Sequence, residues 1–315
     1  MIGFDIGGTK CAVCIGEETD TGIDILKRNE IPTDHSVSAY EMIDRMCGLL
    51  EEMTNDIDVI GISCGGPLNS RTGVIMSPPN LPGWDDVHIV EYLKDKYGKE
   101  VYLQNDADAC AVAEWKFGAG KGCKNMIFMT FGSGLGAGLI LDGKLYTGAC
   151  DMAGEAGHIR LNRFGPVGYG KAGSFEGFCS GNGIAQLGQS YAREKLQMGK
   201  RVSFCEDIQS LDTITAKSIA MCAAMGESDA IEVYARCGEM LGQGLSILID
   251  ILNPERIVLG SVFARCENLL REPMQRVIDR ECLKQSAEAC RVVPAALKDN
   301  IGDYAALAVA AINKE

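Results

Sequence analysis

The stretch of the chain with the clearest chemical potential is YLQNDADACAVAE, residues 102–114, which places one amide and two carboxylates within Asn105 to Asp108. An aspartate at such a position could accept the proton of a substrate hydroxyl as a general base. Asn and Asp are also favoured at helix N-termini, where a cap contributes about 1 kcal/mol. A strand-like run precedes the cluster and an alanine-rich, helix-like run follows it, so the residues alone leave both interpretations open.

Two glycine-rich turns, DIGGTK (residues 5–10) and FGSGLGAG (131–138), could bind phosphate. Neither is a P-loop, and the second fits G-x-G-x-x-A but precedes a strand-like segment, whereas a dinucleotide site needs a helix there. A turn in which glycine supplies positive φ and N–H groups face an anion is the alternative. Asp5 would then hold Mg²⁺ through water, with Thr9 and Lys10 contacting the polyphosphate. An ordinary hairpin explains each turn singly, but two turns after buried strands favour a nucleotide.

The elements around these residues predict a duplicated α/β architecture with a cleft between two lobes. A chain of 315 residues is long enough for two domains. Patterns in the first half predict strands at 1–6, 11–16, 22–31, 57–64 and 100–104, and helices at 37–53, 88–97 and 106–117. The second half repeats strand, glycine turn and strand at 125–146. It continues with helices at 182–196, 215–224 and 229–252, a strand at 256–260 and a helix at 303–314.

Composition excludes several classes of protein. A net charge of −13 argues against nucleic acid or an anionic membrane as partner. The start lacks a signal-peptide pattern and no apolar run is long enough to span a membrane, so we expect a cytoplasmic protein. The fourteen cysteines are scattered singly, as in reduced proteins. Cys11 and Cys14 form a C-x-x-C, but on a strand they point to opposite faces, so neither a redox pair nor a metal clamp is expected.

Seven motifs in order, GFDIGGTK, SPPNLPGW, QNDADA, GSGLGAGLILDGKLYTG, GEAGHI, SFEGFCSG and IVLGSV, resemble those of the ROK sugar kinases, in the actin-like ATPase superfamily, over essentially the whole chain. The resemblance implies an α/β, two-lobed actin-like (ribonuclease-H-like) ATPase fold with an interlobe cleft. The N-terminal lobe would comprise residues 1–117 and 294–315, and the larger C-terminal lobe residues 118–293. The implied reaction transfers the γ-phosphate of ATP, with Mg²⁺, to a hexose hydroxyl, usually the 6-hydroxyl.

The resemblance also implies roles for individual residues. The catalytic base would be Asp106. The sugar would contact Gly66, Asn80, Asn105, Glu155, His158 and Glu176. The phosphates would contact Gly7, Gly8, Thr9, Lys10, Ser133 and Gly134. The adenosine would lie near Gly260 and Ser261, where the family more often has two glycines.

The position of Asp106 at a helix start creates a tension, because the helix dipole stabilises the carboxylate and makes it a weaker base. In a loose phosphoryl-transfer transition state the proton leaves late, so orientation matters more than basicity. Asp106 is therefore expected to be the base. Asn105 and Asp108, the latter usually asparagine in the family, would support the turn. His158 lies within the motif GEAGHI, whereas His35 and His88 belong to no such motif. Both are therefore predicted to lie on the surface.

Many relatives hold a structural zinc with a histidine, which corresponds to His158 here, and three cysteines in C-x-C-G-x-x-G-C-[LW]-E. The corresponding stretch here is VGYGKAGSFE, with Val167, Tyr169 and Ser174 at the thiolate positions. Zinc needs four good ligands, so we predict no zinc site. We expect packing of Tyr169, Phe175 and Phe178 to hold the loop.

The sugar and the oligomeric state stay open at this point. PPNLPGW is common in glucose-phosphorylating members, but mannose, fructose, allose and the N-acetylhexosamines N-acetylmannosamine and N-acetylglucosamine are alternatives. A repressor is disfavoured, because the first phosphate strand begins at Ile2 and leaves no room for a helix-turn-helix domain. A non-catalytic sugar-binding homologue is disfavoured by Asp5, Lys10 and Asp106. Family members are commonly homodimers or homotetramers; small residues from Gly238 to Ser246 would permit close helix packing within or between chains.

Overall fold

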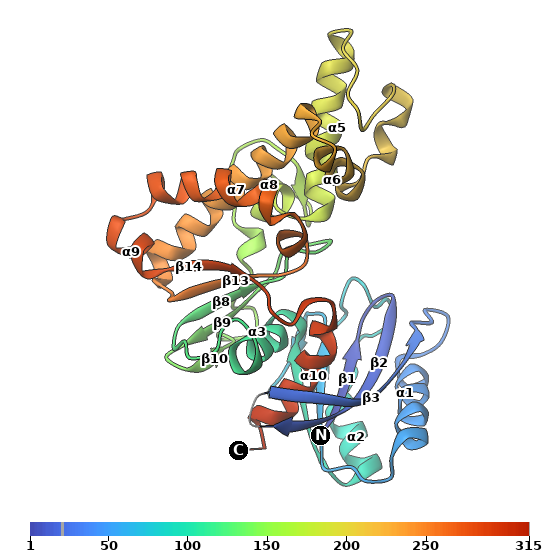
Figure 1. The fold of residues 1–315 in the computed structure, drawn as a ribbon. Coiled ribbons are helices and arrows are strands. Elements are labelled where there is room, and N and C mark those ends of the chain that lie inside the picture. The colour runs from blue at the N-terminus through green and yellow to red at the C-terminus, as the bar shows by residue number, and fades with distance from the viewer. Residues whose placement is uncertain (20–21, 315) are drawn as a thin grey trace. The chain divides into compact units, whose positions relative to one another are not determined.

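The computed structural model describes residues 1–19 and 22–314, apart from the side chain of Asp299. The chain folds into two compact units, one of residues 1–128, 138–154 and 296–315 and one of residues 129–137 and 155–295 (Figure 1). One five-stranded sheet has the order β3 (Gly22–Pro32), β2 (Lys10–Thr19), β1 (Ile2–Ile6), β4 (Val59–Cys64), β7 (Glu100–Asn105). A second has the order β10 (Lys144–Tyr146), β9 (Ala137–Leu141), β8 (Met126–Met129), β13 (Arg256–Leu259), β14 (Arg291–Pro294). The predicted mixed α/β class is confirmed.

The first sheet combines an antiparallel part and a parallel part. Strands β1, β2 and β3 pair antiparallel, whereas β4 lies parallel to both β1 and β7. Every residue of β4 is buried, as its continuous apolar run predicts for a central parallel strand. The register aligns Ile6 with Cys64 and Cys64 with Asn105. The carboxyl ends of β1, β4 and β7 therefore meet at one edge.

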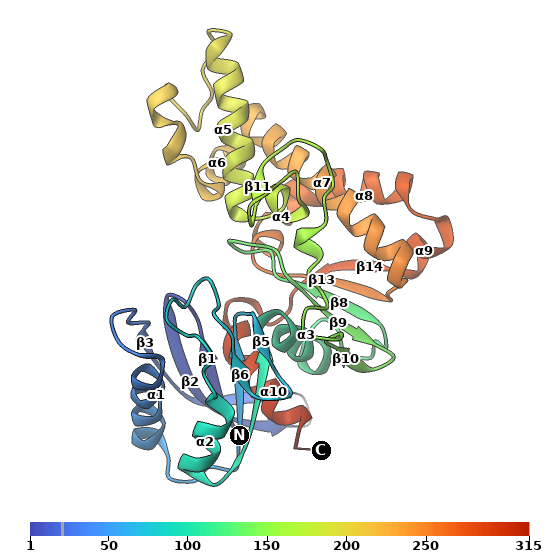
Figure 2. The same ribbon diagram turned by 180° about the vertical axis from the view of Figure 1, so that it is seen from behind.

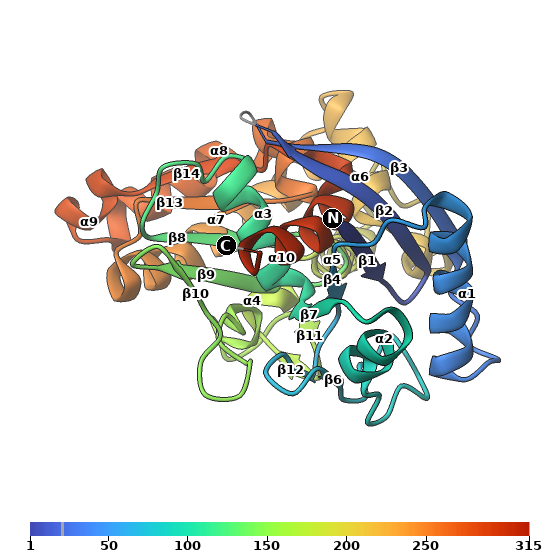
Figure 3. The same cartoon turned by 90° about the horizontal axis from the view of Figure 1, so that it is seen from below.

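Helices cover both faces of this sheet. Side chains of α1 (Ala39–Met53) and α2 (Ile89–Tyr97) share a core cluster with Phe4 and Cys11. On the opposite face, α10 (Ile301–Ile312) packs over β1, β2 and β4 and lies beside α3 (Asp106–Phe117), as Figure 3 shows. Cys14 belongs to the cluster on that side. The two cysteines of the C-x-x-C thus lie on opposite faces, as predicted.

Helix α10 lies unusually close to the sheet because glycines on the strands face alanines on the helix. A Cβ atom on Gly61 would lie 2.2 Å from the carbonyl oxygen of Ala306 and 2.5 Å from the backbone nitrogen of Ala310. A side chain there would push the helix away. The same approach brings the first turn of α10 to Asp5, since a Cβ on Gly302 would lie 2.5 Å from Asp5 Oδ2.

The second unit contains a helical layer, visible in Figure 2. Its helices are α4 (Phe175–Phe178), α5 (Gly181–Gln197), α6 (Ala216–Ala224), α7 (Ser228–Leu252), α8 (Val262–Glu281) and α9 (Lys284–Ala289). Helix α8, which the sequence patterns did not predict, contains Pro273 and a non-helical Cys266. The small residues of α7 pack on α8, where a Cβ on Gly238 would lie 2.6 Å from Pro273 Cγ. This stripe therefore serves packing within the chain.

Short elements complete the two units. Two small antiparallel pairs consist of β5 (Leu68–Asn69) with β6 (Val74–Ile75) and β11 (Val167–Gly168) with β12 (Lys171–Ala172). The 3₁₀ helices are η1 (Ala156–His158), η2 (Ile208–Thr213) and η3 (Lys298–Asn300). None of the helices in the described ranges is both long and apolar enough to cross a bilayer. All fourteen cysteines are free thiols, and ten of them are buried.

Candidate functional site

The site residues predicted in the first unit gather at the carboxyl edge of β1, β4 and β7. Asp5 is the penultimate residue of β1, and the turn 7–10 leads directly into β2. The loop after β4 brings Gly66 to Asn105, since a Cβ on Gly66 would lie 2.9 Å from Asn105 Nδ2. Asn105 ends β7, and Asp106 begins α3. In open α/β sheets, this is the edge at which ligands bind.

Asn80 reaches the same edge from the loop SPPNLPGW. Leu81 and Trp84 in that loop are buried, with relative exposures of 0% and 4%, and they anchor it while Asn80 stays exposed. A Cβ on Gly8 would lie 2.5 Å from the Asn80 carbonyl oxygen, so the first glycine turn and this loop are in direct contact. The asparagine amide also lies beside Gly65. The structure thus joins two motifs that lie about 70 residues apart.

The aspartates after β7 have different environments. Asn105 caps α3 by accepting from the Ala107 N–H at 3.0 Å, and Asp106 Oδ1 accepts from the same N–H at 2.7 Å. Asp106 is exposed at the sheet edge, whereas Asp108 is only 2% exposed and accepts from Gln104 Nε2 at 2.9 Å. Asp106 is therefore the one of the two carboxylates that a ligand at this edge can reach.

Asp5 stands out electrostatically. The pKa of its carboxyl is raised to about 7, first by burial and then by the neighbouring carboxylates of Asp303 and Asp106, while Lys10 and Arg28 act in the opposite direction. Three carboxylates near one buried position disfavour a negative charge there without a cation. A cation at this edge would therefore favour the charged form of Asp5.

Two residues that sequence reasoning missed support the first glycine turn. Thr33 donates through its hydroxyl to the Gly7 carbonyl oxygen at 2.6 Å, and a ring nitrogen of His35, Nε2, lies 2.9 Å from the Gly8 carbonyl oxygen. His35 and His88 are exposed, as predicted. The contacts of Thr33 and His35 with this turn have no sequence signal, because they depend on where the segment after β3 passes.

The expectation of positive φ in the glycine turns is wrong. Among the described residues with positive φ, none belongs to 7–10 or 132–136. Gly8 is required because the Asn80 backbone lies against it. A Cβ on Gly134 would lie 2.8 Å from Glu176 Oε2, the tip of a flexible side chain that could move to make room. Close approach, not backbone conformation, selects glycine at position 8.

In the second unit, Glu176 binds the second glycine turn. Its Oε2 accepts from the Leu135 N–H at 3.0 Å, directly after Ser133 and Gly134. The turn also receives the start of α5, whose Gly181 N–H donates to the Gly132 carbonyl oxygen at 2.7 Å. The start of α5 was not assigned a role from the sequence, although the serine cap of S-G-N-G, Ser180, was a readable helix signal.

Glu155 precedes the single turn of η1 and His158 is its last residue, near Glu176. Loss of hydration raises the pKa of the Glu155 carboxyl, His158 lowers it in part, and the Glu176 carboxylate raises it again. Both Glu155 and His158 keep contact with solvent. The three side chains predicted to line the sugar are thus electrostatic neighbours within this unit.

The segment that holds zinc in many relatives is held here without thiolates. Ser174 caps α4 by accepting from the Gly177 N–H at 3.1 Å, and Val167 exchanges two hydrogen bonds with Gln186. Phe175 and Phe178 are buried, as expected, but Tyr169 is 75% exposed. The predicted packing of Tyr169 into the loop is therefore wrong; its ring meets His158 edge-on at 6.2 Å between centroids.

No group of three or more His, Cys, Asp or Glu side chains within residues 1–19 and 22–314 is arranged to hold a metal ion. The absence of zinc stays a prediction.

Gly260 and Ser261, the predicted adenosine contacts, follow β13, and the Gly260 N–H donates to the Met129 carbonyl oxygen at 3.0 Å. Ser261 has a φ of 42°, the left-handed region that favours glycine, which gives a physical reason for the glycine more usual there.

The sheet order, the carboxylates at its edge and a glycine turn in each unit define a two-lobed, actin-like ATPase fold. A glucokinase of Streptomyces coelicolor is 30% identical over 282 residues, covering 89% of this chain and 87% of that protein. A ROK family glucokinase from Streptomyces griseus, solved with glucose and AMPPNP, has a TM-score of 0.77 at 26% identity and 99% coverage of both chains. An N-acetylmannosamine kinase of Citrobacter koseri is 27% identical, covering 86% of each chain. The chain belongs to the ROK family, which matches residues 1–312.

Proposed function

We propose that the protein is an ATP-dependent hexose kinase that transfers the γ-phosphate of ATP to the 6-hydroxyl of glucose or a related hexose. The observation that carries the proposal is the meeting of Asp5, the turn 7–10, Gly66, Asn80, Asn105 and Asp106 at one sheet edge. A phosphate-binding turn and a carboxylate base must be close neighbours if one site is to transfer phosphate to a hydroxyl. Similarity to two glucokinases favours glucose.

In this proposal Asp106 accepts the proton of the sugar hydroxyl. Its hydrogen bond to Ala107 N–H orients the carboxylate at the exposed sheet edge, where a sugar hydroxyl can reach it. Asn105 and Gly66, which are in contact, would position neighbouring sugar hydroxyls, together with Asn80. A general base of this kind typically contributes about 10²–10⁴-fold to the rate.

The phosphates would lie against Gly7, Gly8, Thr9 and Lys10, with Ser133 and Gly134 as the second contact and Gly260 and Ser261 near the adenosine. Asp5 would hold Mg²⁺ through water, and that cation would neutralise charge on the phosphates. The exposure of Lys10 and Thr9 supports a contact with a soluble ligand.

Glu155, His158 and Glu176 would complete the sugar contacts. One Glu176 oxygen is already engaged by Leu135, so its second oxygen would accept from the sugar. The hydrogen bond between Leu135 and Glu176 would then link the sugar site to the second phosphate turn.

Residues 1–117 with 294–315 and residues 118–293 are our proposed functional lobes. We also propose that the protein acts as a homo-oligomer in the cytoplasm.

An N-acetylhexosamine kinase, acting on N-acetylmannosamine or N-acetylglucosamine, is the second candidate. The 27% identity to an N-acetylmannosamine kinase favours it. A loop at 167–174 that contains no cysteine also permits a substrate preference unlike that of zinc-containing relatives, since this loop lies beside His158 and Glu176.

The test is a coupled assay of ADP formation with Mg-ATP and a panel of hexoses and N-acetylhexosamines. The protein is first treated with chelator and then given Mg²⁺ alone. Turnover far higher with glucose than with the other sugars is the expected result. Preference for an N-acetylhexosamine would establish the second candidate. A folded protein that binds ATP but turns over no sugar would refute the kinase proposal and favour a non-catalytic sugar-binding homologue.

A further inference from the structure

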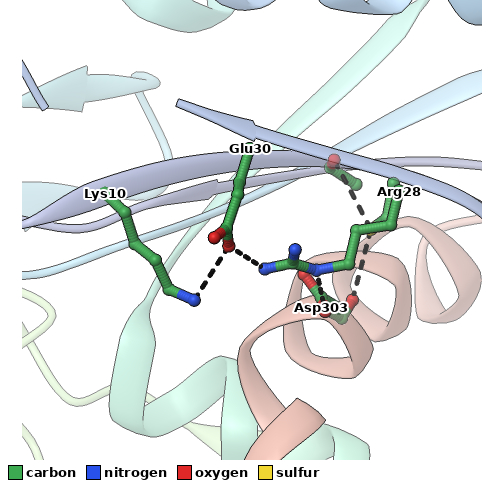
Figure 4. Close-up of polar contacts among 6 residues, drawn as sticks. Lys10, Arg28, Glu30 and Asp303 are labelled. Carbon is green, nitrogen blue, oxygen red and sulfur yellow. Dashed lines mark hydrogen bonds and ion pairs between the residues drawn. The ribbon is translucent and has the colours of Figure 1, made fainter. Parts of the chain in front are cut away.

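A chain of alternating charges leads from the first glycine turn to the C-terminal helix of the same unit (Figure 4). Glu30 Oε2 accepts from Lys10 Nζ at 2.9 Å and from Arg28 Nη2 at 2.6 Å. Arg28 Nε in turn donates to Asp303 Oδ2 at 2.7 Å. Lys10 lies on β2, Arg28 and Glu30 on β3, and Asp303 on α10.

The strand register explains why these side chains meet. Ala12 is paired with Glu30 and Lys10 with Pro32 across the antiparallel strands. Lys10 and Glu30 are therefore diagonal neighbours on one face, a distance that long side chains can bridge. Cys14 is paired with Arg28, and its Sγ donates to the Asp303 carbonyl oxygen at 3.6 Å. The small Ala12 and Cys14 leave room on this face for the longer charged groups.

The chain of charges is fixed at its buried end. The Asp303 side chain is only 5% exposed, and its second oxygen, Oδ1, accepts no hydrogen bond from the part of the chain that the structure describes. A buried carboxylate in this situation depends strongly on its cationic partner, so Arg28 is held in place. Arg28 then fixes Glu30, and Glu30 fixes the ammonium group of Lys10.

The exposed end has a different significance. The side chains of Lys10 and Glu30 are 56% and 44% exposed, and an ion pair between such groups contributes at most about 1 kcal/mol to stability. The ion pair instead matters because it orients the Lys10 side chain. An ammonium group has three N–H donors, and Glu30 engages one of them. Two donors stay available to a phosphate, on a side chain whose direction is already set.

We propose that Glu30 is a positioning residue for ATP: supported by Arg28 and Asp303, it holds Lys10 in the orientation in which its ammonium group contacts the phosphates. The proposal rests on the proposed function for the ligand but not for the geometry. A positioning role and a purely electrostatic effect of Glu30 predict opposite changes in ATP affinity when the residue is removed. A carboxylate close to the phosphates should repel them, so removal of its charge alone should strengthen ATP binding.

The test is a double-mutant cycle of Glu30→Ala and Lys10→Ala, read first as the dissociation constant of Mg-AMPPNP and then as kinetic constants. Glu30→Ala releases the Lys10 side chain. This variant should weaken nucleotide binding and raise KM for ATP about 2- to 10-fold, without changing KM for the sugar. In the Lys10→Ala background, where there is no lysine to position, Glu30→Ala should no longer weaken binding, and any change that remains should be toward tighter binding. Glu30→Gln, which keeps an acceptor oxygen, should restore part of the affinity.

Glu17→Ala is the matched control, because it removes the same charge from an exposed position of the same hairpin. It should leave nucleotide binding unchanged. Tighter binding by Glu30→Ala, or equal losses in both Lys10 backgrounds, would overturn the positioning role. The two proposals fail separately: a wild type that binds Mg-AMPPNP with the expected coupling but phosphorylates no sugar refutes the kinase assignment alone.

Discussion

Replacing Asp5 with asparagine should change how the stability of the N-terminal unit depends on pH. The pKa of Asp5 rises from 3.8 to about 7 in the folded protein, chiefly because of burial and then because of Asp303 and Asp106. A carboxyl whose pKa is raised by folding stabilises the folded state fully at pH values below its unfolded pKa. This contribution is lost as the pH rises toward 7.

The expected loss can be worked out from the difference between the two pKa values. About three pH units, at about 1.4 kcal/mol per unit, give about 4 kcal/mol as an upper limit, because Asp5 retains some contact with solvent. The asparagine side chain of the variant has no such titration. The free energy of unfolding of Asp5→Asn minus that of the wild type should therefore increase between pH 4 and pH 7 and then level off.

Urea unfolding followed by tryptophan fluorescence measures this difference. The chain has two tryptophans, Trp84 and Trp115, and both belong to the unit that contains Asp5, so the signal reports on that unit. The measurement is repeated from pH 4.5 to 8.5 for both proteins and for Asp24→Asn, an exposed control on β3. Parallel pH profiles for wild type and Asp5→Asn would refute the assignment of a raised pKa to this carboxyl.

Three further predictions concern the base, the helix contact and the metal. Asp106→Asn should lower kcat about 10²–10⁴-fold with little change in KM for ATP, whereas Asp108→Asn, which can still accept from the Gln104 amide, should stay within about threefold of the wild type. Gly61→Ala should destabilise the first unit by about 1–3 kcal/mol in the same urea assay, because its Cβ would lie 2.2 Å from an α10 carbonyl oxygen. Gly48→Ala, with open space around its Cβ in α1, should stabilise it by up to about 1 kcal/mol. Metal analysis of the purified protein should find no stoichiometric zinc, and chelation followed by Mg²⁺ alone should leave activity and melting temperature unchanged.

Each of these predictions has a clear contrary outcome. Unchanged kcat in Asp106→Asn would mean that another group accepts the proton. Equal stability of the two alanine variants would mean that α10 does not approach the sheet as closely as the structure has it. Bound zinc, or a melting temperature that falls on chelation, would mean that Ser174 and its neighbours are supplemented by ligands from elsewhere.

The sequence alone determined the elements that depend on local patterns. The continuous apolar run at 57–64 predicted a buried central strand, which β4 is. The alternation of side chains along a strand correctly placed Cys11 and Cys14 on opposite faces of the sheet. The spacing of the motifs also identified the family, because an ordered set of short motifs is far more specific than any single glycine turn. Where the local signal was mixed, as for α8 with its internal proline, the pattern failed.

Only the tertiary structure decided which of these residues meet. Gly8 is required by the approach of the Asn80 backbone, and Glu176 lies against Gly134, but neither approach is visible in the turns themselves. Likewise, Asp303 and Arg28 are 275 positions apart and are brought together because α10 packs on the face of β2 and β3. Local sequence sets backbone conformation and the pattern of burial. The pKa of Asp5 instead depends first on burial and then on charges from distant segments, and Lys10 pairs with Glu30 of the neighbouring strand; only the packed chain brings these groups within reach.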